Sequence, residues 1–228
     1  MVVLVSTRHT GGRRMQRFIL QSNIERYRTL LGTEDQESSR AWLLAMIAAG
    51  QRELAVLNAA VGGVRVGPAP PGSRLARANR LRAEFQKSLE TCDEAVLILE
   101  PGPGLHIVDL SEVYAQATLI ERSAVAGELI FDVFPDNPAD PTADGVSNLY
   151  ASLRRAAETG QADAMAVQRY DVRGPDGVFV EKFWSPINTP VFDEGGHLAY
   201  IVHRVQDVTG RMRPHSLSAE RPAASLAG

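Results

Sequence analysis

The strongest constraint on the fold is the stretch of residues 179–207, which reads FVEKFWSPINTPVFDEGGHLAYIVHRVQD. Thr, Val, Phe, Trp, Tyr and Ile, which favour strands, are dense on both sides of the Asp-Glu-Gly-Gly segment at 193–196. Asp and Gly are typical of tight turns, so the pattern predicts two long strands joined as an antiparallel hairpin. The rest of the chain is expected to pack against this hairpin or to lead into it.

The composition is that of a globular protein rather than of a nucleic-acid or membrane-surface binder. Of 228 residues, 44% are hydrophobic and 22% are charged, which is enough to bury a core in one domain with appendages or in two small domains. The formal net charge of -3 gives no global electrostatic reason to bind nucleic acid or a membrane surface.

Cysteine usage and hydropathy indicate the compartment. Cys92 is the only cysteine, which excludes an intramolecular disulfide and a multi-cysteine metal site and is compatible with a reducing compartment. The apolar run at the N-terminus is too short for the core of a signal peptide, and no later run approaches the roughly 20 apolar residues that span a bilayer. We therefore expect a cytoplasmic protein with no membrane association.

Residues 15–60 are predicted to form a helical hairpin, preceded by a disordered segment, 1–14, that is rich in Arg, Gly, Ser and Thr. Gly32 ends the first helix, and Thr33 with Gln36 fits a capping box that begins the second. Each helix carries an apolar stripe, formed by Leu20, Ile24, Tyr27 and Leu31 in the first and by Leu43, Ile47, Leu54 and Leu57 in the second.

This helical hairpin needs a partner surface. Two striped helices joined by a short loop have too little core to stand alone, so they should pack on the rest of the chain or on a second copy. We expect a homodimer through these helices. The alternative is an ordinary helical layer that covers the sheet.

A linker and a connecting helix follow. Gly and Pro dominate residues 61–72, VGGVRVGPAPPG, and neither residue sustains a helix or an inner strand. Ser73 then caps a helix over 73–92. Its apolar side carries Leu75, Ala78, Phe85, Leu89 and Cys92, and its other sides carry Arg74, Arg77, Arg80, Arg82 and Lys87. Such a basic face is usually solvated, and no aromatic or recognition-helix pattern supports nucleic-acid binding.

The segment from residue 93 onward predicts a sheet with inserted helices. The expected strands are 95–99, 105–109, 164–172 and the two strands of the hairpin, with turns at 101–104 and 173–177. The expected helices are 111–118, 122–129, 131–134 and 142–159. Helices inserted between the second and third of five strands give an α+β fold, a five-stranded antiparallel sheet with helices on one face.

Residues 93–209 resemble a PAS domain, the small sensory fold of bacterial signalling proteins. The resemblance rests on the order of elements and on the phrases AVLILEPGPGLHIVDLSEVYAQAT, GELIFDVFPDNP and YDVRGPDGVFVEKFWSPINTPVFDEGGHLAYIVHRVQDVT. The last phrase ends in Asp207-Val208-Thr209, similar to the Asp-Ile/Val-Thr that commonly ends the final strand of PAS domains. One departure is Asp109-Leu110-Ser111, where PAS domains often carry Asn.

The resemblance implies a mechanism and limits the cofactor. PAS domains hold a ligand, a cofactor or nothing between the sheet and the helical wall, and they pass a change there to flanking helices. A flavin-cysteinyl adduct is excluded, because no Cys follows Asp93. Haem is not expected, because residues 142–159 lack the His that the best-known haem sensors place there. No His pair shows metal-ligand spacing, so no metal is predicted and the cofactor stays unknown.

Polar and aromatic strand residues are the candidate ligand-binding side chains. An inward Trp or Tyr can stack on a planar ligand, and Gln or Asn can orient it by hydrogen bonds. The candidates are Gln168, Tyr170, Trp184, Ser185, Asn188 and His203. His203 should point inward, because Ile201 and Val205 on the same strand face are apolar. The alternative is that alternation sends half of these residues to the surface and that the aromatics only fill the core.

No catalytic motif is present, so we do not expect an enzyme. The segment 210–228 is rich in Pro, Ser and Ala and is expected to be disordered, and no effector domain is found after Thr209. The sequence predicts a stand-alone sensory or regulatory protein that binds a small molecule or a partner protein and signals to an effector supplied in trans. The alternatives are a structural adaptor with a filled core and a transcription regulator that uses helix 73–92.

Overall fold

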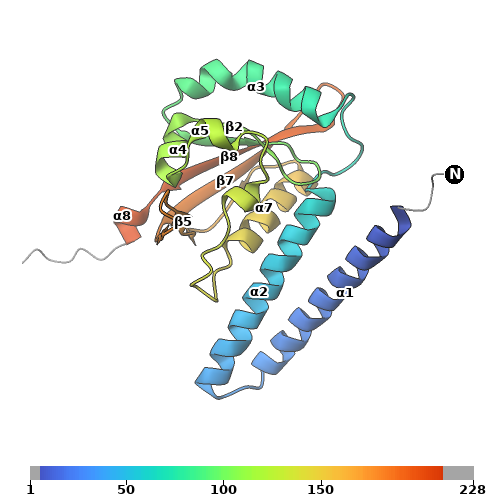
Figure 1. Cartoon of the computed structure of the whole chain (residues 1–228), viewed down its shortest axis with the longest axis vertical. Helices are drawn as coiled ribbons and strands as arrows, with labels where there is room; N and C mark the ends of the chain where they lie inside the picture. Colours follow the sequence, from blue (N-terminus) through green and yellow to red (C-terminus); the bar gives the residue numbers. More distant parts are fainter. Residues whose placement is uncertain (1–5, 213–228) are drawn as a thin grey trace, which may run out of the picture.

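The computed structural model describes residues 6–212 and contains an antiparallel sheet flanked by helices on both faces (Figure 1). The strand order is β2-β1-β8-β7-β3, and β4 also pairs with β7. The strands are β1 (Ala95–Leu99), β2 (Ile107–Leu110), β3 (Asp163–Ala164), β4 (Gln168–Arg169), β7 (Phe183–Phe192) and β8 (Leu198–Asp207). A separate two-stranded sheet pairs β5 (Val172–Arg173) with β6 (Phe179–Val180). The predicted α+β antiparallel fold is confirmed, with the inserted helices on one face of the sheet. The main sheet has six strands rather than the predicted five, and the helix that follows Ser73 covers the other face.

The long hairpin predicted from residues 179–207 forms the centre of the sheet. Strands β7 and β8 pair from Trp184 opposite Asp207 to Phe192 opposite Leu198. The turn closes where the N–H of Asp193 donates to the carbonyl of His197 at 2.9 Å. Because β8 also pairs with β1, this hairpin connects the two halves of the sheet.

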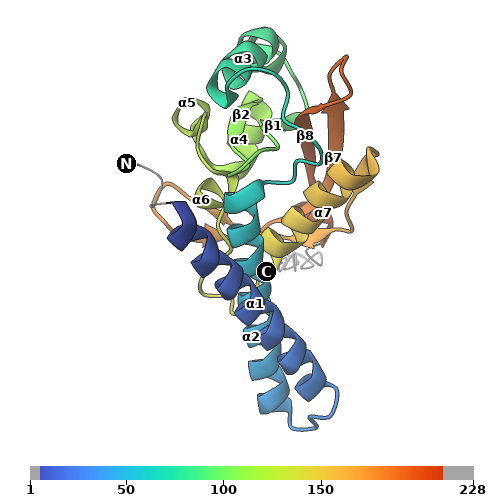
Figure 2. The same cartoon turned by 90° about the vertical axis from the view of Figure 1, so that its right-hand side faces the viewer.

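Four helices lie between β2 and β3 in the chain and cover the inner face of the sheet, as predicted (Figure 2). They are α4 (Glu112–Thr118), α5 (Arg122–Val125), α6 (Ile130–Val133) and α7 (Gly145–Thr159). Helix α5 ends earlier than residue 129, because the following segment bonds along β2: the N–H of Ile107 donates to the carbonyl of Glu128. Strand β2 starts later than predicted, because the φ of 50° at Leu105 takes that residue out of extended backbone.

The departure from the PAS pattern at Asp109 has a structural role. Its carboxylate accepts two hydrogen bonds from Arg122, from Nε at 2.9 Å and from Nη2 at 2.8 Å. A bidentate Arg–carboxylate pair fixes both partners in orientation. Asp109 therefore holds α5 against β2, and Ser111 caps α4 by accepting from the N–H of Tyr114.

Helix α3 (Arg74–Glu90) covers part of the outer face of the sheet. Ser73 caps it as predicted, with its hydroxyl accepting from the N–H of Ala76. Successive strand side chains point to opposite faces, so the residues of β1 that do not face α4 pack under this helix. That outer cluster consists of Leu89, Val96, Ile98 and Val108, with Leu81 and Phe85 beside it. Leu75, predicted on the apolar side, is 65% exposed, because it lies in the first turn, beyond the edge of the cluster.

The two N-terminal helices form the predicted antiparallel hairpin with different ends. Helix α1 (Ser6–Leu31) begins well before residue 15, so the disorder predicted for 1–14 is wrong from Ser6 onward, and residues 1–5 lie outside the described part. Gly11 and Gly12 lie within the first part of α1 and lower its helix propensity, but they do not break the helix. Helix α2 (Glu37–Gly62) starts without the predicted capping box, because the hydroxyl of Thr33 donates to the carbonyl of Leu30 instead.

The hairpin packs on the domain through one half of α2 and projects away from it through the other (Figures 1 and 2). Ala48, Ala55 and Ala59 of α2 are buried, and α2 contacts α7. Because alanine side chains are small, they allow α2 to approach α7 closely. Of the described helices, α2 alone is long and apolar enough to cross a membrane, with 22% of that window buried. That window contains Gln51, Arg52 and Glu53, so α2 passes on its mean hydropathy and has no uninterrupted apolar run of about 20 residues.

The predicted strand 164–172 is broken into short pieces. Asp163 and Ala164 pair with Asn188 and Ile187, whereas Gln168 pairs with Trp184. Between these pairings, β7 carries Pro186, which has no N–H to donate to a ladder. The missing N–H of Pro186 in β7 therefore interrupts the ladder with residues 164–172, which the alternation of the sequence predicted as one strand.

Two further boundaries differ from the prediction. Helix α7 begins at Gly145 rather than residue 142, because Thr142 is held in a turn by hydrogen bonds to the carboxylate of Asp140. The segment 210–228 was predicted to be disordered, yet α8 (Thr209–Met212) extends into it. Residues 213–228 lie outside the described part.

Candidate functional site

A small cavity lies between the inner face of the sheet and the helical wall, as the PAS resemblance implies. Its volume is about 50 Å³. The side chains and backbone around it belong to α4, α7, the strands β4, β5, β7 and β8, and the segments between them. The lining residues are Tyr114, Thr118, Phe134, Gly145, Leu149, Met165, Gln168, Tyr170, Val172, Trp184, Pro186, His203 and Val205.

Most of the predicted ligand-binding residues meet at this cavity. Gln168, Tyr170, Trp184 and His203 line it. Asn188 is fully buried beside His203 and does not line the cavity. The prediction for Ser185 is wrong, because Trp184, Pro186 and Asn188 occupy the inner face of β7 and strand alternation sends Ser185 to the other face.

Several polar groups around the cavity are already hydrogen-bonded within the wall. The indole Nε1–H of Trp184 donates to the carbonyl of Tyr170 at 2.8 Å. The hydroxyl of Tyr170 donates to the carbonyl of Phe134, and the side-chain carbonyl of Gln168 accepts from Asn148 at 2.7 Å. These bonds hold the aromatic rings in place, so the bonded groups shape the cavity rather than offer free hydrogen-bonding positions.

His203 presents a neutral imidazole at the cavity. It is only 4% exposed, and burial lowers its pKa from 6.5 to about 4. The ring is therefore uncharged at neutral pH. Its Nδ1 lies 2.7 Å from the side-chain oxygen of Asn188. The sequence prediction that His203 points inward is confirmed.

A buried chain of hydrogen bonds continues from His203 to the surface. The amide nitrogen of Asn188 donates to the hydroxyl oxygen of Ser152 at 2.7 Å. The Ser152 hydroxyl in turn donates to a carboxylate oxygen of Asp163. Arg155 donates two hydrogen bonds to that carboxylate, and these bonds lower the pKa of Asp163. The chain therefore ends in an ionised acid that can only accept.

Tyr114 is a site residue that the sequence reasoning did not identify. It is 4% exposed, and its ring meets the ring of His203 edge-on with a centroid distance of 6.0 Å. Burial raises the pKa of its hydroxyl. Tyr114 lies in α4, which the sequence predicted only as one of the helices that cover the sheet. Its contact with His203 depends on how α4 crosses β8. No sequence pattern specifies that crossing.

A second missed feature links the wall of the cavity to α2. Asp136 follows the cavity residue Phe134, and its Oδ1 accepts from the N–H of Val146 at 3.0 Å. Its Oδ2 lies 2.9 Å from Nε of Arg52, but the N–H does not point at the oxygen. Burial raises the pKa of Asp136 more than its hydrogen bond and Arg52 lower it. Arg52 also donates to the carbonyl of Ala143 at 2.9 Å.

The remaining surfaces offer less specific chemistry. An open depression of about 1490 Å³ lies between α3, α4, α5 and the β5–β6 loop, where Asp109 and Arg122 already satisfy each other. Within residues 6–212, no group of three His, Cys, Asp or Glu side chains could hold a metal ion. The small cavity is the better candidate, because convergent aromatic and polar groups with a shifted pKa are typical of binding sites.

Taken together, the antiparallel sheet, the helices inserted between its second and third strands and the cavity beneath them make a PAS-like fold. Structures similar to this one include the PAS domain of a protein from Colwellia psychrerythraea, at 12% identity and a TM-score of 0.42, covering 57% of this chain and 99% of that one. A PAS domain from the fruit-fly ELK potassium channel is 10% identical, with a TM-score of 0.39 and coverage of 60% and 99%. A light-oxygen-voltage domain is 17% identical, with a TM-score of 0.39 and coverage of 58% and 87%.

The description as PAS-like rests on the element order and the cavity, and these distant likenesses add nothing about a ligand. No protein-family model matches the chain, and no curated protein matches it either.

Proposed function

We propose that this protein is a sensory or regulatory module that binds a small molecule in the cavity and transmits its presence through α2 to an effector supplied in trans. We propose no catalytic activity for this protein and a location in the cytoplasm. It assigns separate roles to the parts of the chain, with detection beneath the sheet and output at the helical hairpin.

The contact between Asp136 and Arg52 carries this proposal. Asp136 lies in the segment that links α6 to α7, directly after the cavity wall at Phe134. Arg52 lies in α2, so a shift of this wall changes a contact made by the N-terminal helices. A ligand that favours one position of the wall would then bias the hairpin, which is the requirement for coupling between two sites.

Native mass measurement and an absorption spectrum of the purified protein provide the first test. A bound mass or chromophore that is released on unfolding supports a sensor. Xenon under pressure provides the second test, because it enters small apolar cavities without needing hydrogen bonds. Amide signals of the cavity residues should shift in NMR spectra, and signals of α2 near Arg52 should shift with them.

Matched variants separate transmission from simple binding. In Arg52→Ala, xenon should still shift the cavity signals, and the response in α2 should be reduced. Arg40→Ala is the control, because Arg40 lies in the same helix and donates to the carbonyls of Leu31 and Glu34, away from the cavity. A full response of α2 in Arg52→Ala would contradict transmission through this contact, and a protein without bound mass or any xenon shift would contradict sensing.

The size of the cavity favours a second candidate function, a structural adaptor with a filled core. About 50 Å³ is the space of one or two water molecules, since a water occupies about 30 Å³ in the liquid. A flavin or haem would require the wall to move outward. If the purified protein has the mass of its chain alone and xenon does not enter, the adaptor is the better description.

The structure gives less support to a transcription regulator that uses the basic helix. Arg77 of α3 contacts the buried carboxylate of Glu100, and Arg82 donates to the carbonyl of Val108. These two cations are engaged within the domain, so fewer remain to track phosphates.

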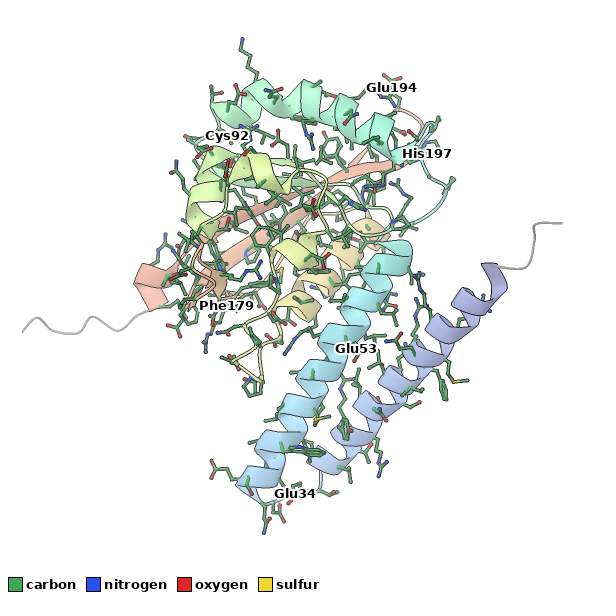
Figure 3. All side chains as sticks on the ribbon, viewed as in Figure 1. Glu34, Glu53, Cys92, Phe179, Glu194 and His197 are labelled. Atoms are coloured by element: carbon green, nitrogen blue, oxygen red, sulfur yellow. The ribbon has the colours of Figure 1, made fainter. Side chains whose placement is uncertain are left out.

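We also propose that the projecting hairpin forms a homodimer. Large apolar side chains are exposed along it, namely Met15, Phe18, Ile19, Leu30, Trp42, Leu44, Val56 and Val61. In Figure 3, Glu34 marks the tip of this hairpin, far from Phe179 in the domain. A second copy could bury these side chains in a four-helix bundle, the usual solution for two amphipathic hairpins.

Analytical ultracentrifugation tests the dimer. Trp42→Glu places a charge beside the exposed Leu30 and should shift the protein to monomer at micromolar concentration. Val178→Glu is the matched control, because Val178 is 60% exposed but lies in the β5–β6 loop. Wild-type protein that sediments as a monomer at all concentrations would exclude the homodimer.

A further inference from the structure

The hydrogen-bond chain behind His203 fixes which ring nitrogen carries the proton. Asp163 is ionised and can only accept, so Ser152 must donate to it. Ser152 then accepts from the amide nitrogen of Asn188, which leaves the amide oxygen of Asn188 facing Nδ1 of His203. An oxygen acceptor requires a donor, so Nδ1 carries the hydrogen.

The consequence is a hydrogen-bond acceptor at the cavity. A neutral imidazole with its hydrogen on Nδ1 has a lone pair on Nε2. No residue that the structure describes donates to this nitrogen, and His203 lines the cavity. His203 is thus a buried polar side chain with one satisfied and one unsatisfied position.

Tyr114 supplies the complementary donor. Among the residues whose side chains the structure describes, 12–212, none forms a hydrogen bond with its hydroxyl, and burial accounts for its raised pKa. The ring lies against the imidazole of His203 and lines the same cavity. The other polar side chains around the cavity, those of Thr118, Gln168, Tyr170 and Trp184, already make hydrogen bonds within the protein.

The rest of the lining decides the charge of the ligand. No Asp, Glu, Lys or Arg lines the cavity, which is otherwise formed by apolar side chains such as Leu149, Val172 and Val205. An ion would lose its hydration there without gaining a partner of opposite charge, whereas a neutral molecule loses much less.

We propose that the cavity selects a small neutral molecule that presents an acceptor and a donor side by side, as a primary amide does, with its oxygen toward the Tyr114 hydroxyl and its N–H toward Nε2 of His203. This inference rests on the proposed sensory function and names its ligand class. The flexible thioether of Met165 is part of the lining, so modest enlargement for a ligand of a few heavy atoms needs no change of backbone.

Acetamide, acetone and acetate are the probes, because they share one size and shape. Acetamide offers both an acceptor and a donor, acetone only an acceptor, and acetate a charge. The indole N–H signal of Trp184 in the NMR spectrum reports occupancy, because that side chain lines the cavity. We expect acetamide to bind in the millimolar range and at least about fivefold more tightly than acetone or acetate, since an unmatched buried polar group is costly.

Variants assign the preference to the named groups. Tyr114→Phe removes one oxygen and should weaken acetamide about fivefold while leaving acetone nearly unchanged. Tyr200→Phe is the matched control, because Tyr200 packs on Phe85 on the outer face and should change neither. The ¹⁵N shifts of the His203 ring should show a hydrogen on Nδ1 in the wild type, and Ser152→Ala should weaken that tautomeric preference.

The outcomes separate the ligand class from the proposed function. Equal binding of acetamide and acetone, tighter binding of acetate, an unaffected Tyr114→Phe variant or a hydrogen on Nε2 would overturn the ligand class. In those cases xenon or the probes still enter the cavity, and the sensory function stands. If neither xenon nor any of the three probes shifts the Trp184 signal, the cavity is closed and both proposals fail.

Discussion

Two buried carboxylates connect the N-terminal part of the chain to the domain, and they are satisfied to different degrees. Glu100 follows β1 and contacts the guanidinium groups of both Arg65 and Arg77, while its second oxygen accepts from the N–H of Gly102 at 2.9 Å. Among the described residues, Asp136 contacts one guanidinium, that of Arg52, without a well-directed hydrogen bond.

The difference indicates which junction is fixed and which can move. Arg65 lies within the predicted linker 61–72 and Arg77 lies in the first turns of α3, so Glu100 holds both the linker and the start of α3 against the end of β1. Burial lowers the pKa of Arg65, but no accessible pH discharges a guanidinium next to a carboxylate. At Asp136, by contrast, burial raises the pKa of the acid itself. The Glu100 junction should therefore be a permanent anchor, and the Asp136 junction a contact that a small energy can change.

The strongest way to break this comparison is Glu100→Ala. It leaves two largely buried guanidinium groups with only backbone carbonyl acceptors and no anionic partner, and breaking a buried ion pair in this way costs about 3–5 kcal/mol. We expect a loss of this size in the free energy of unfolding, measured in urea. Arg154→Ala is the control, since Arg154 pairs with Glu158 on the surface and should cost less than about 1 kcal/mol. Equal losses in both variants would show that Glu100 is no anchor.

Gly63→Ala tests the same anchor through the backbone. Gly63 follows α2 with φ of 62° and ψ of -137°, a conformation that side chains rarely adopt, and a Cβ there would lie 2.0 Å from the carbonyl oxygen of Gly102. Strain of this kind costs about 1–3 kcal/mol, and the clash adds to it. We expect a destabilisation of about 3 kcal/mol. Gly62→Ala is the control, because its Cβ would meet nothing within 4 Å.

The sequence predicts local structure better than it predicts these junctions. The hairpin of β7 and β8, the Ser73 cap and the helices inserted after β2 depend on local alternation, turn chemistry and spacing, and each is confirmed. The segment 61–72 was expected to be a linker from its Gly and Pro content, and composition contains no information about Arg65 reaching Glu100. Ion pairs and crossings between distant segments depend on the tertiary fold.

The candidate site shows the same limit. Alternation along β8 was enough to place His203 inward, because its neighbours on that face are apolar. On β7 both Trp184 and its neighbour Ser185 were candidates, since no signal fixed which face of the strand was buried before its register with β8 was known, and Ser185 lies on the other face. Tyr114 and Asp136 come from segments without a strand period, so nothing in the sequence placed them beside the cavity.

At the weaker junction, Asp136→Asn should change the free energy of unfolding by less than about 1 kcal/mol, because the burial penalty on the charge, which raises the pKa of Asp136, offsets the lost contact with Arg52. Asn keeps an oxygen that can accept from the N–H of Val146, and it loses only a poorly directed charge contact with Arg52. A urea titration at neutral pH measures the change. A loss as large as that of Glu100→Ala would mean that both carboxylates are anchors and that the comparison is wrong.

The smallest effect is the pH dependence of the Asp136 junction. Burial raises the pKa of Asp136 above its ordinary 3.8, so in the window above 3.8 the folded protein binds a proton that the unfolded chain does not. The stability contributed by this proton is fully present below 3.8 and is lost as the pH rises through the folded pKa. The wild type should therefore gain stability relative to Asp136→Asn as the pH falls through this window.

The wild type must be measured against Asp136→Asn, because other groups of the protein titrate in the same pH range. His203 has a pKa lowered to about 4, so stability is lost as the pH falls from 6.5 toward 4, in the opposite direction. The pKa of His203 is lowered by burial, and His203 is present in both proteins, so its contribution cancels in the difference. Arg52, Asp144 and Tyr170 interact with the charge of Asp136 and therefore enter the difference through that interaction. Urea titrations across this range give the difference in unfolding free energy. If the wild type instead loses stability relative to Asp136→Asn as the pH falls, attraction to Arg52 outweighs burial, and Asp136 is held as firmly as Glu100.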